Sequence, residues 1–318
     1  MKKIGAVGEI LVEIMALDPG DGFREPLRLE GPYPSGAPAI FIDQVARLGQ
    51  PCALVSCVGN DDFGVLNVNR LARDGVDVRA ITVDPEAATG SAFVRYRLDG
   101  TRDFVFNIRH SACGRIDWTA EAADVIAGCD HIHVMGSSLF APCIVKATEA
   151  AIDNVKRRGG SVSFDPNIRK EMLALPGIRE AYSRILEQST LFLPSGPELF
   201  LFTAACQEAE AAQELVAKGV SCVVVKSGAE GARCYSAEGM LEQPAFPANE
   251  RDPTGAGDCF GATFVTCWLR GMPLRRALAL AAASGARAVE RQGPMEGTSG
   301  LAELEAMLSP GGPAGGAR

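Results

Sequence analysis

The stretch from Arg251 to Phe264, RDPTGAGDCFGATF, places glycines and the carboxylate of Asp258 at the start of an apolar run that predicts a helix. Gly255 and Gly257 have no Cβ, so their backbone N–H groups can approach a ligand closely. The amino end of the expected helix adds unpaired N–H groups and the positive end of the helix dipole. Together these features predict a site for the negative charge of a phosphate.

Asp258 needs a separate explanation, because a carboxylate repels phosphate. Taking the proton from an attacking hydroxyl fits this position, since a base within hydrogen-bond reach of the nucleophile speeds its attack on the γ-phosphorus. An ordinary glycine turn in which Asp258 caps the helix is the alternative. The Lys-Ser/Thr pair of a Walker A loop and the dinucleotide GxGxxG spacing are both absent from this stretch.

Short apolar strands alternate with amphipathic helices along most of the chain, which is the pattern of a layered α/β fold. The expected strands are 3–10, 52–59, 131–136, 161–166, 189–194 and 221–228, and the expected helices include 37–49, 62–76, 143–160 and 208–219. This order predicts one large domain over residues 1–308, followed by a low-complexity tail at 309–318.

Two segments depart from this alternation. Residues 90–109 alternate apolar and polar side chains around Asp99-Gly100, a strong hairpin turn signal. Residues 15–36 form a Gly/Pro-rich excursion between the first strand and the first helix. We expect both to form a small β flap, with inserted lid segments at about 11–34 and 89–112, although an edge decoration of the sheet is the alternative.

The composition limits the possible partners and compartments. With 47% hydrophobic and 22% charged residues the chain can bury a sizeable core, and a net charge of −8 argues against a general binder of nucleic acid or anionic membranes. The ten cysteines are scattered without a CxxC pair, which favours buried free thiols in a reducing cytoplasm. No apolar run approaches the ~18 residues that a membrane helix needs.

Several motifs resemble those of the phosphofructokinase-B (ribokinase-like) carbohydrate kinase family. DPTGAGD is similar to the C-terminal signature of the family, and SGAPAIFIDQVARLG is similar to its N-terminal motif. TGSAFV, SFDPNIR and KSGAEGA also follow the family's order, so the resemblance covers the chain from Lys3 to about Leu308. It implies a three-layer α/β/α core with a mainly parallel sheet, plus a small β lid.

The resemblance also implies the groups that handle ATP. Asp258 would be the catalytic base, and the amides of Gly255, Ala256 and Gly257 would form the anion hole. Nucleotide and phosphate contacts would come from Lys226, Gly228, Gly231 and Thr254, together with Gly255 and Gly257. For Lys226, a solvated lysine at a strand end is an equally good interpretation.

Ions are implied at two further positions. Glu198 in PSGPE matches the glutamate that organises Mg²⁺ through water, although Ser195 replaces the asparagine of that motif. Ser195 is equally consistent with a helix N-cap. Asp252 and the VERQGPM segment match the region in which the family often holds K⁺.

The expected sugar contacts depart from the common pattern at the amino-terminal motif. Glu13 stands where many relatives have an aspartate, and Ser35-Gly36 replaces a double glycine. Ile40 occupies the place of an asparagine that often contacts the sugar, and losing that amide could cost about tenfold for a substrate that needs it. Further contacts are expected from Arg109, Asn167 and Arg169, although Arg109 could equally be an exposed lid charge.

SFDPNIR is similar to the fructokinase and 2-keto-3-deoxygluconate kinase branches. The lid strand FVFNIRH lacks the tyrosines of the keto-acid enzymes, which favours a neutral ketohexose, and GEILVEIM and GPMEGTS resemble sequences described as tagatose kinases. We therefore expect phosphorylation of D-tagatose at its 6-hydroxyl, with fructose and 2-keto-3-deoxygluconate as alternatives. A non-catalytic sugar or nucleotide sensor is the rival from another class. The apolar lid residues Phe93, Phe104 and Phe106 could support a homodimer or pack on the core.

Overall fold

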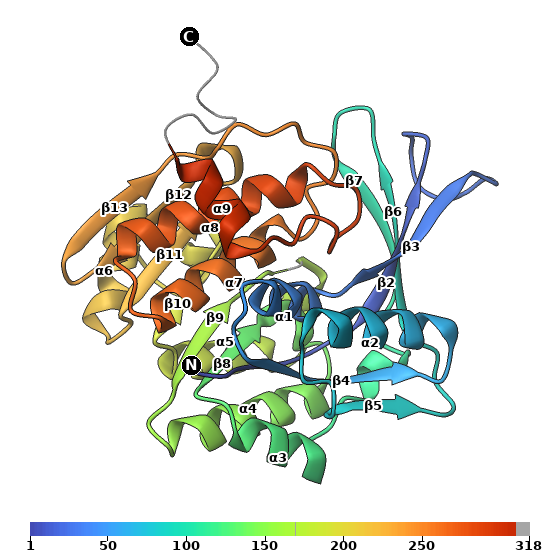
Figure 1. The fold of residues 1–318 in the computed structure, drawn as a ribbon, viewed down its shortest axis with the longest axis horizontal. Coiled ribbons are helices and arrows are strands. Elements are labelled where there is room, and N and C mark those ends of the chain that lie inside the picture. The colour runs from blue at the N-terminus through green and yellow to red at the C-terminus, as the bar shows by residue number, and fades with distance from the viewer. Residues whose placement is uncertain (169, 310–318) are drawn as a thin grey trace.

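A nine-stranded sheet runs through the centre of the protein, with helices on both faces (Figure 1). The computed structural model describes residues 1–168 and 170–309. From one edge to the other, the strands are β13 (Gly239–Gln243), β12 (Ala232–Ser236), β11 (Cys222–Lys226), β10 (Leu191–Phe192), β9 (Ser161–Asp165), β8 (His131–Met135), β1 (Ile4–Val7), β4 (Cys52–Gly59) and β5 (Ile81–Asp84). The strands from β11 to β5 are parallel, whereas β12 and β13 add an antiparallel edge.

Alternating side chains of the buried strands build a separate apolar core on each face of this sheet. In β11, for example, Cys222 and Val224 belong to one core, and Val223 and Val225 belong to the other. The first core packs under α1 (Ala37–Arg47), α2 (Asp62–Asp74), α7 (Ala256–Leu269), α8 (Leu274–Val289) and α9 (Leu301–Leu308). The second packs under α3 (Ala120–Ala127), α4 (Pro142–Lys156), α5 (Ile178–Glu187) and α6 (Glu208–Ala217). The predicted three-layer α/β/α core is confirmed.

A second sheet of four strands, here called the lid, projects from one side of the core (Figure 1). Its order is β3 (Leu29–Ser35), β2 (Leu11–Ala16), β6 (Gly90–Tyr96) and β7 (Arg102–Asn107). The hairpin predicted at Asp99-Gly100 joins β6 to β7, and Gly100 has a positive φ of 81° that suits glycine. Strand β7 is the outer edge, and Phe104, Val105 and Phe106 on it are exposed.

Two strand predictions were wrong in their extent. The strand expected over 3–10 ends at Val7, and the chain then enters the other sheet as β2. Gly8 lies at this break, where a Cβ would come within 2.4 Å of Pro38 Cγ, so close packing against α1 accompanies the change of direction. The strand expected over 189–194 is reduced to the two residues of β10.

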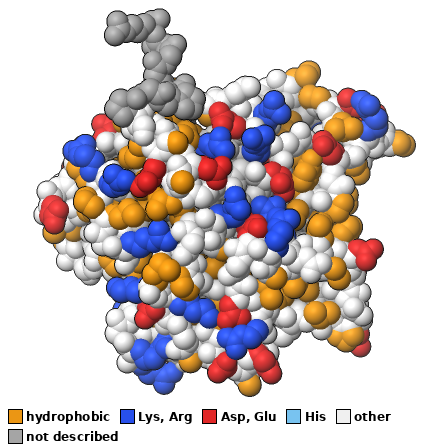
Figure 2. All heavy atoms as spheres, in the orientation of Figure 1, with side chains coloured by type: hydrophobic (Ala, Val, Ile, Leu, Met, Phe, Trp, Pro, Cys, Tyr) orange, Lys and Arg blue, Asp and Glu red, His pale blue; other side chains and the backbone are white. Residues whose placement is uncertain are grey.

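Five 3-10 turns complete the described structure: η1 (Ala112–Arg115), η2 (Gly136–Ser138), η3 (Lys170–Ala174), η4 (Gly196–Leu201) and η5 (Gly228–Glu230). Within the described ranges, no helix is long and apolar enough to cross a membrane. Acidic and basic side chains are interspersed over the face shown in Figure 2. Residues 310–318 of the tail expected at 309–318 lie outside the described residues, as does Arg169.

Candidate active site

A cavity of about 910 Å³ lies between the lid and the carboxyl-end edge of the core strands. Both sheets contribute to its wall, along with the amino end of α7. The predicted site residues on this wall are Glu13, Ser35, Gly36, Ile40, Arg109, Asn167, Lys226, Thr254, Gly255, Gly257 and Asp258. Residues separated by more than 200 positions in the sequence therefore meet at one cavity, whose size suits a small-molecule site.

The glycine-rich loop turns into α7 at this wall. Gly255 is the N-cap residue, and its φ of 83° is one that glycine adopts readily. A Cβ there would also lie 2.6 Å from the carbonyl oxygen of Pro294. Ala256, Gly257 and Asp258 form the first turn of the helix, and Asp258 is 8% exposed. The amide edge and the carboxylate thus face one cavity, as the sequence predicts.

The space beside Gly257 is open toward the cavity. A Cβ built on this residue would have Lys226 Nζ at 3.6 Å as its sole non-local neighbour within 4 Å among the described residues. Open space at a helix amino end, with a lysine beside it, is a cradle that suits a phosphate. The residues present therefore fit the phosphate end of a nucleotide.

Lys226, at the end of β11, forms a buried ion pair with Asp165 at the end of β9. Burial raises the pKa of Asp165, and the Lys226 ammonium opposes this shift. Asp165 also accepts a hydrogen bond from the backbone N–H of Asn167 at 3.2 Å, and Asn167 has an unusual φ of 40°. Lys226 is thus a largely buried, ion-paired side chain at the cavity wall, with 11% of the side chain exposed. The interpretation of Lys226 as a solvated lysine is wrong.

The predicted nucleotide turn follows β11 directly. Gly228 and Gly231 both have positive φ values, 56° and 100°. A Cβ on Gly231 would lie 2.1 Å from the carbonyl oxygen of Gln243, which makes glycine necessary there. Neither glycine is among the residues that line the cavity, so this turn lies beyond the Lys226 end of it.

Glu198 lies behind the cavity wall. Its Oε1 accepts the N–H of Ile168 and its Oε2 accepts the N–H of Ser195, both at 2.6 Å. Burial and the nearby Asp165 carboxylate raise the pKa of Glu198. Ser195 itself lines the cavity and is the N-cap residue of η4. Glu198 therefore holds the backbone at Ser195 and Ile168 through hydrogen bonds. Among the described residues, no cluster of three or more His, Cys, Asp or Glu side chains is suited to a metal.

Asp252 is almost fully buried, at 1% exposure, and both its carboxylate oxygens accept hydrogen bonds. Oδ1 accepts from the Tyr96 hydroxyl at 2.8 Å and from the Thr254 N–H at 3.0 Å, and Oδ2 accepts from the Gly293 N–H at 3.0 Å. Asp252 thus joins the lid, the glycine-rich loop and the segment after α8. These three donors occupy most of the acceptor positions of the carboxylate, so a cation there would compete with them or use the remaining position on Oδ2.

The expected sugar-binding groups line the lid side of the cavity. Glu13, on β2, is buried and lies 3.4 Å from the Thr254 hydroxyl, which donates to it. Gly36 has a φ of 112°, and a Cβ there would lie 2.4 Å from the carbonyl oxygen of Glu9. Ile40 packs toward the glycine-rich loop, since a Cβ on Gly255 would come within 3.1 Å of its Cγ2. Arg109 lines this cavity and a second one of about 710 Å³.

Three residues at the site were not predicted. Tyr96 and Arg102 face each other across the lid hairpin and contact Asp252 and Thr254, respectively. Their pairing follows from the Asp99-Gly100 turn, but the partners in the core do not. Glu9 is a buried carboxylate on the cavity wall that accepts a hydrogen bond from the Ser138 hydroxyl. Its position after β1 carries no signal that separates it from a strand residue.

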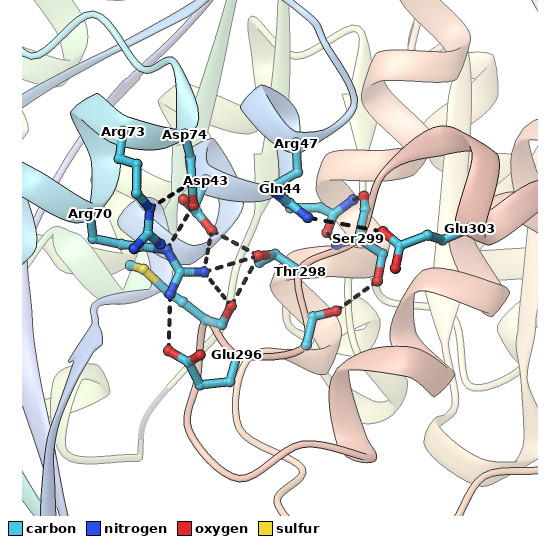
Figure 3. Close-up of polar contacts among 12 residues, drawn as sticks. Asp43, Gln44, Arg47, Arg70, Arg73, Asp74, Glu296, Thr298, Ser299 and Glu303 are labelled. Carbon is cyan, nitrogen blue, oxygen red and sulfur yellow. Dashed lines mark hydrogen bonds and ion pairs between the residues drawn. The ribbon is translucent and has the colours of Figure 1, made fainter.

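A largely buried polar network contacts residues 295–298, directly after the loop that holds Gly293 (Figure 3). Arg70, on α2, donates to Asp74 Oδ2 at 2.7 Å, to Asp43 Oδ2 at 3.3 Å, to Glu296 Oε1 at 2.9 Å and to the carbonyl of Met295 at 2.7 Å. Burial raises the pKa of Asp43 to about 7, even though Arg70 opposes the shift. The network ties α1 and α2 to the loop before α9, and so to the backbone that contacts Asp252.

Comparison with known proteins identifies the family. The model of the pfkB family carbohydrate kinases matches residues 1–299. This chain belongs to that family. The kinase is 31% identical to 2-dehydro-3-deoxygluconokinase of Thermoproteus tenax over 316 residues, which covers 97% of this chain and 94% of the relative.

Solved structures show the same fold. An E. coli protein named "putative Ribokinase II", in complex with ATP and Mg²⁺, is 50% identical to this kinase, with a TM-score of 0.93 over 97% of this chain and 99% of the other. A fructokinase variant from Vibrio cholerae O395, bound to fructose, ADP and potassium ion, is 27% identical, with a TM-score of 0.82 over 97% and 99% of the two chains. The predicted family, fold class and enzyme class are thereby confirmed: the protein is an ATP-dependent sugar kinase.

Proposed function

We propose that this kinase transfers the γ-phosphoryl group of ATP to the primary 6-hydroxyl of a neutral ketohexose, with D-tagatose as the first candidate. The observation that carries the proposal is the shared cavity of Asp258, the Gly255–Gly257 amide edge and the buried Glu13. It combines a base, a phosphate cradle and a carboxylate able to accept hydrogen bonds from sugar hydroxyls. The substrate assignment beyond the family rests on the sequence motifs.

In the proposed reaction, the acceptor oxygen attacks the γ-phosphorus as its proton passes to Asp258. The new P–O bond forms on one side while the bond to the β-phosphate oxygen breaks on the other, and ADP leaves. The amides of Gly255, Ala256 and Gly257, at the positive end of α7, stabilise the charge on the transferred group. Thr254 and the turn at Gly228 and Gly231 contact the nucleotide.

Lys226, whose Nζ lies beside the open space at Gly257, is proposed to contact the phosphates. Its ion pair with Asp165 would hold the ammonium group in place. Bound Mg²⁺ would neutralise phosphate charge, and Glu198 and Ser195 would contact it through water. K⁺ has a weaker basis, because the oxygens of Asp252 already accept hydrogen bonds from Tyr96, Thr254 and Gly293. We therefore propose ATP and Mg²⁺ as requirements, with K⁺ as an optional activator.

On the acceptor side, Glu13, Ser35, Gly36 and Asn167 are proposed to contact the sugar, with Ile40 as an apolar wall. The same role was expected of Arg169, which lies outside the described residues. A 2-keto-3-deoxygluconate kinase is the second candidate, because Arg109 lines the cavity and the T. tenax relative carries the name of that activity. A carboxylate substrate would place its charge on Arg109.

The lid, residues 11–34 and 89–112, is proposed to cover the acceptor and exclude water, which otherwise competes as acceptor.

The outer strand of the lid, β7, exposes Phe104 and Phe106, whose ring centres lie 5.0 Å apart in a stacked arrangement. An exposed apolar edge strand invites pairing with a second copy. We propose a homodimer through β7, which replacement of Phe106 by serine would weaken in sedimentation experiments.

The cytoplasm is the proposed compartment, since eight of the described cysteines are buried free thiols.

The experiment that tests this function follows ADP release with MgATP against D-tagatose, D-fructose, 2-keto-3-deoxygluconate, ribose and adenosine. We expect strong turnover on a ketohexose, and a loss of about 10²–10⁴-fold in kcat for Asp258→Asn. Preference for the keto-acid would move the assignment to the second candidate. Binding of sugar or ATP without stimulated ADP release would show a sensor instead.

A further inference from the structure

Arg102, the first residue of β7, lies on the cavity wall together with Asp258 and Gly257. Its Nη1 donates to the Thr254 hydroxyl at 3.2 Å. Thr254 directly precedes Gly255, where the amide edge of α7 begins. The guanidinium of a lid residue therefore lies at the margin of the phosphate cradle, in contact with the glycine-rich loop of the core.

The register of the lid hairpin fixes this position. Arg102 is the cross-strand partner of Tyr96, whose hydroxyl donates to Asp252 Oδ1 at 2.8 Å. The two neighbours thus attach to Asp252 and Thr254, which are two residues apart in the glycine-rich loop. Two contacts from adjacent strands orient the hairpin against the loop more tightly than a single contact could.

The charge of Arg102 sets it apart from the arginines nearest to it in the lid. Arg97 forms an ion pair with Asp103 at 2.6 Å, and Arg95 lies 3.6 Å from Glu25. Arg102 makes no ion pair with any residue that the structure describes, and its guanidinium lies 5.4 Å from the ring centre of Phe104. An aromatic face supports a cation without neutralising it. Arg102 therefore keeps a full positive charge toward an anion in the cavity.

We propose that Arg102 is a catalytic residue that donates hydrogen bonds to the phosphoryl group during its transfer. This inference rests on the proposed function. Charge spreads over the equatorial oxygens of the phosphoryl group in the transition state, where a fixed guanidinium stabilises it. The planar fork of arginine suits two such oxygens.

The location of Arg102 on the lid gives this contact a second consequence. The cation reaches the cradle while the hairpin lies over the acceptor, in the arrangement that excludes water. Transfer to the sugar then proceeds with the positive charge of Arg102 beside the phosphoryl group. When the lid does not lie over the acceptor, the phosphate cradle lacks this charge. Arg102 thus links coverage of the acceptor to the rate of transfer.

The first test compares Arg102→Ala and Arg102→Lys with a matched lid variant, Arg97→Ala, on the acceptor that wild type turns over best. Arg102→Ala is expected to lower kcat by about 10²–10³-fold, while the KM of the acceptor changes less than about threefold. Arg102→Lys should retain part of the rate, and added guanidinium ion should partly restore Arg102→Ala. Arg97→Ala should stay within about threefold of wild type.

The second test measures binding, which separates a role in transfer from a role in holding the lid. ADP with aluminium fluoride imitates the transferring phosphoryl group, so Arg102→Ala should bind it more weakly by about the factor lost in kcat. The affinity for a non-hydrolysable ATP analogue should stay within about threefold. Equal losses for both ligands, or a raised acceptor KM with unchanged kcat, would overturn the proposal.

These measurements also separate this inference from the proposed function. Wild-type protein that phosphorylates none of the five acceptors refutes the ketohexose kinase assignment. The affinity of wild type and Arg102→Ala for ADP with aluminium fluoride still decides the role of Arg102, because that measurement requires no acceptor turnover.

Discussion

The hydroxyl of Tyr96 donates to Asp252 Oδ1 over 2.8 Å and so joins the lid to the loop that leads into α7. Burial and the Asp252 carboxylate raise the pKa of Tyr96, so the phenol remains a donor throughout the neutral range. Asp252 in turn holds the N–H groups of Thr254 and Gly293. One buried carboxylate is therefore hydrogen-bonded to the lid, to the loop that leads into the phosphate cradle and to the segment after α8.

Replacing Tyr96 by phenylalanine should loosen the lid without removing a group from the phosphate cradle. A hydrogen bond to a charged acceptor contributes about 1.5–3 kcal/mol, so we expect an increase of about tenfold or more in the KM of the acceptor. Acceptor-independent ADP release should also rise, because water gains access. Tyr235→Phe is the control, since Tyr235 donates to Glu208 at the same 2.8 Å distance away from the cavity. Identical kinetics for the two variants would contradict the lid contact.

Monovalent cations should have a small effect on the wild-type enzyme. The oxygens of Asp252 already accept three hydrogen bonds, which neutralise part of the charge that K⁺ would otherwise bind. We expect less than about a threefold change in kcat when K⁺ is replaced by tetramethylammonium at constant ionic strength. Tyr96→Phe removes one donor and should respond more strongly to K⁺. A large K⁺ requirement in wild type would show that these hydrogen bonds do not prevent the cation from binding.

The ion pair of Lys226 and Asp165 should dominate local stability at the end of β11. Lys226→Met leaves a buried carboxylate uncompensated and should lower the free energy of unfolding by about 3–5 kcal/mol in urea titrations. The double variant Lys226→Met with Asp165→Asn should recover most of that loss. Lys218→Met breaks an exposed pair with Glu214 and should cost less than about 1 kcal/mol. Equal losses in the single and double variants would argue against the pair.

Stability should depend on pH through Asp43. Burial raises the pKa of Asp43 to about 7, compared with about 3.9 in an unfolded chain. Between these values the native state binds the extra proton, so stability is present at the acidic end and declines as pH rises through 7. From pH 5 to pH 8, wild type should lose roughly 2.5 kcal/mol relative to Asp43→Asn. Parallel pH profiles from thermal unfolding would contradict the protonated Asp43.

Much of the fold could be predicted because its signals are local. The apolar runs of β4, β8 and β11 are bounded by turns, and the Asp99-Gly100 pair marks the lid hairpin and its register. The break between β1 and β2 was missed, because apolar residues lie on both sides of the Gly8-Glu9 pair and alternation alone does not reveal a change of sheet. The antiparallel β12–β13 edge was also not predicted.

The same contrast holds for the site. Thr254, Gly255, Gly257 and Asp258 lie within five consecutive residues, so their chemistry can be inferred from spacing, and all four line the cavity. The contacts that position them are distant in the sequence. Tyr96 lies 156 residues from Asp252, and Arg102 lies 152 residues from Thr254. Such pairs depend on how the two sheets meet, and no single segment encodes that geometry.

The two sheets draw on different parts of the chain. Strands β2, β3, β6 and β7 all come from the first 107 residues, whereas Lys226 and the glycine-rich loop come from the last third. Most of the proposed sugar contacts therefore come from a part of the chain other than the one that supplies the proposed phosphate contacts, with Asn167 of the core and Arg102 of the lid as the exceptions. Exchange of the lid strands between relatives could redirect the enzyme to another sugar while the transfer machinery stays intact, provided that the residues at positions 96 and 102 are kept.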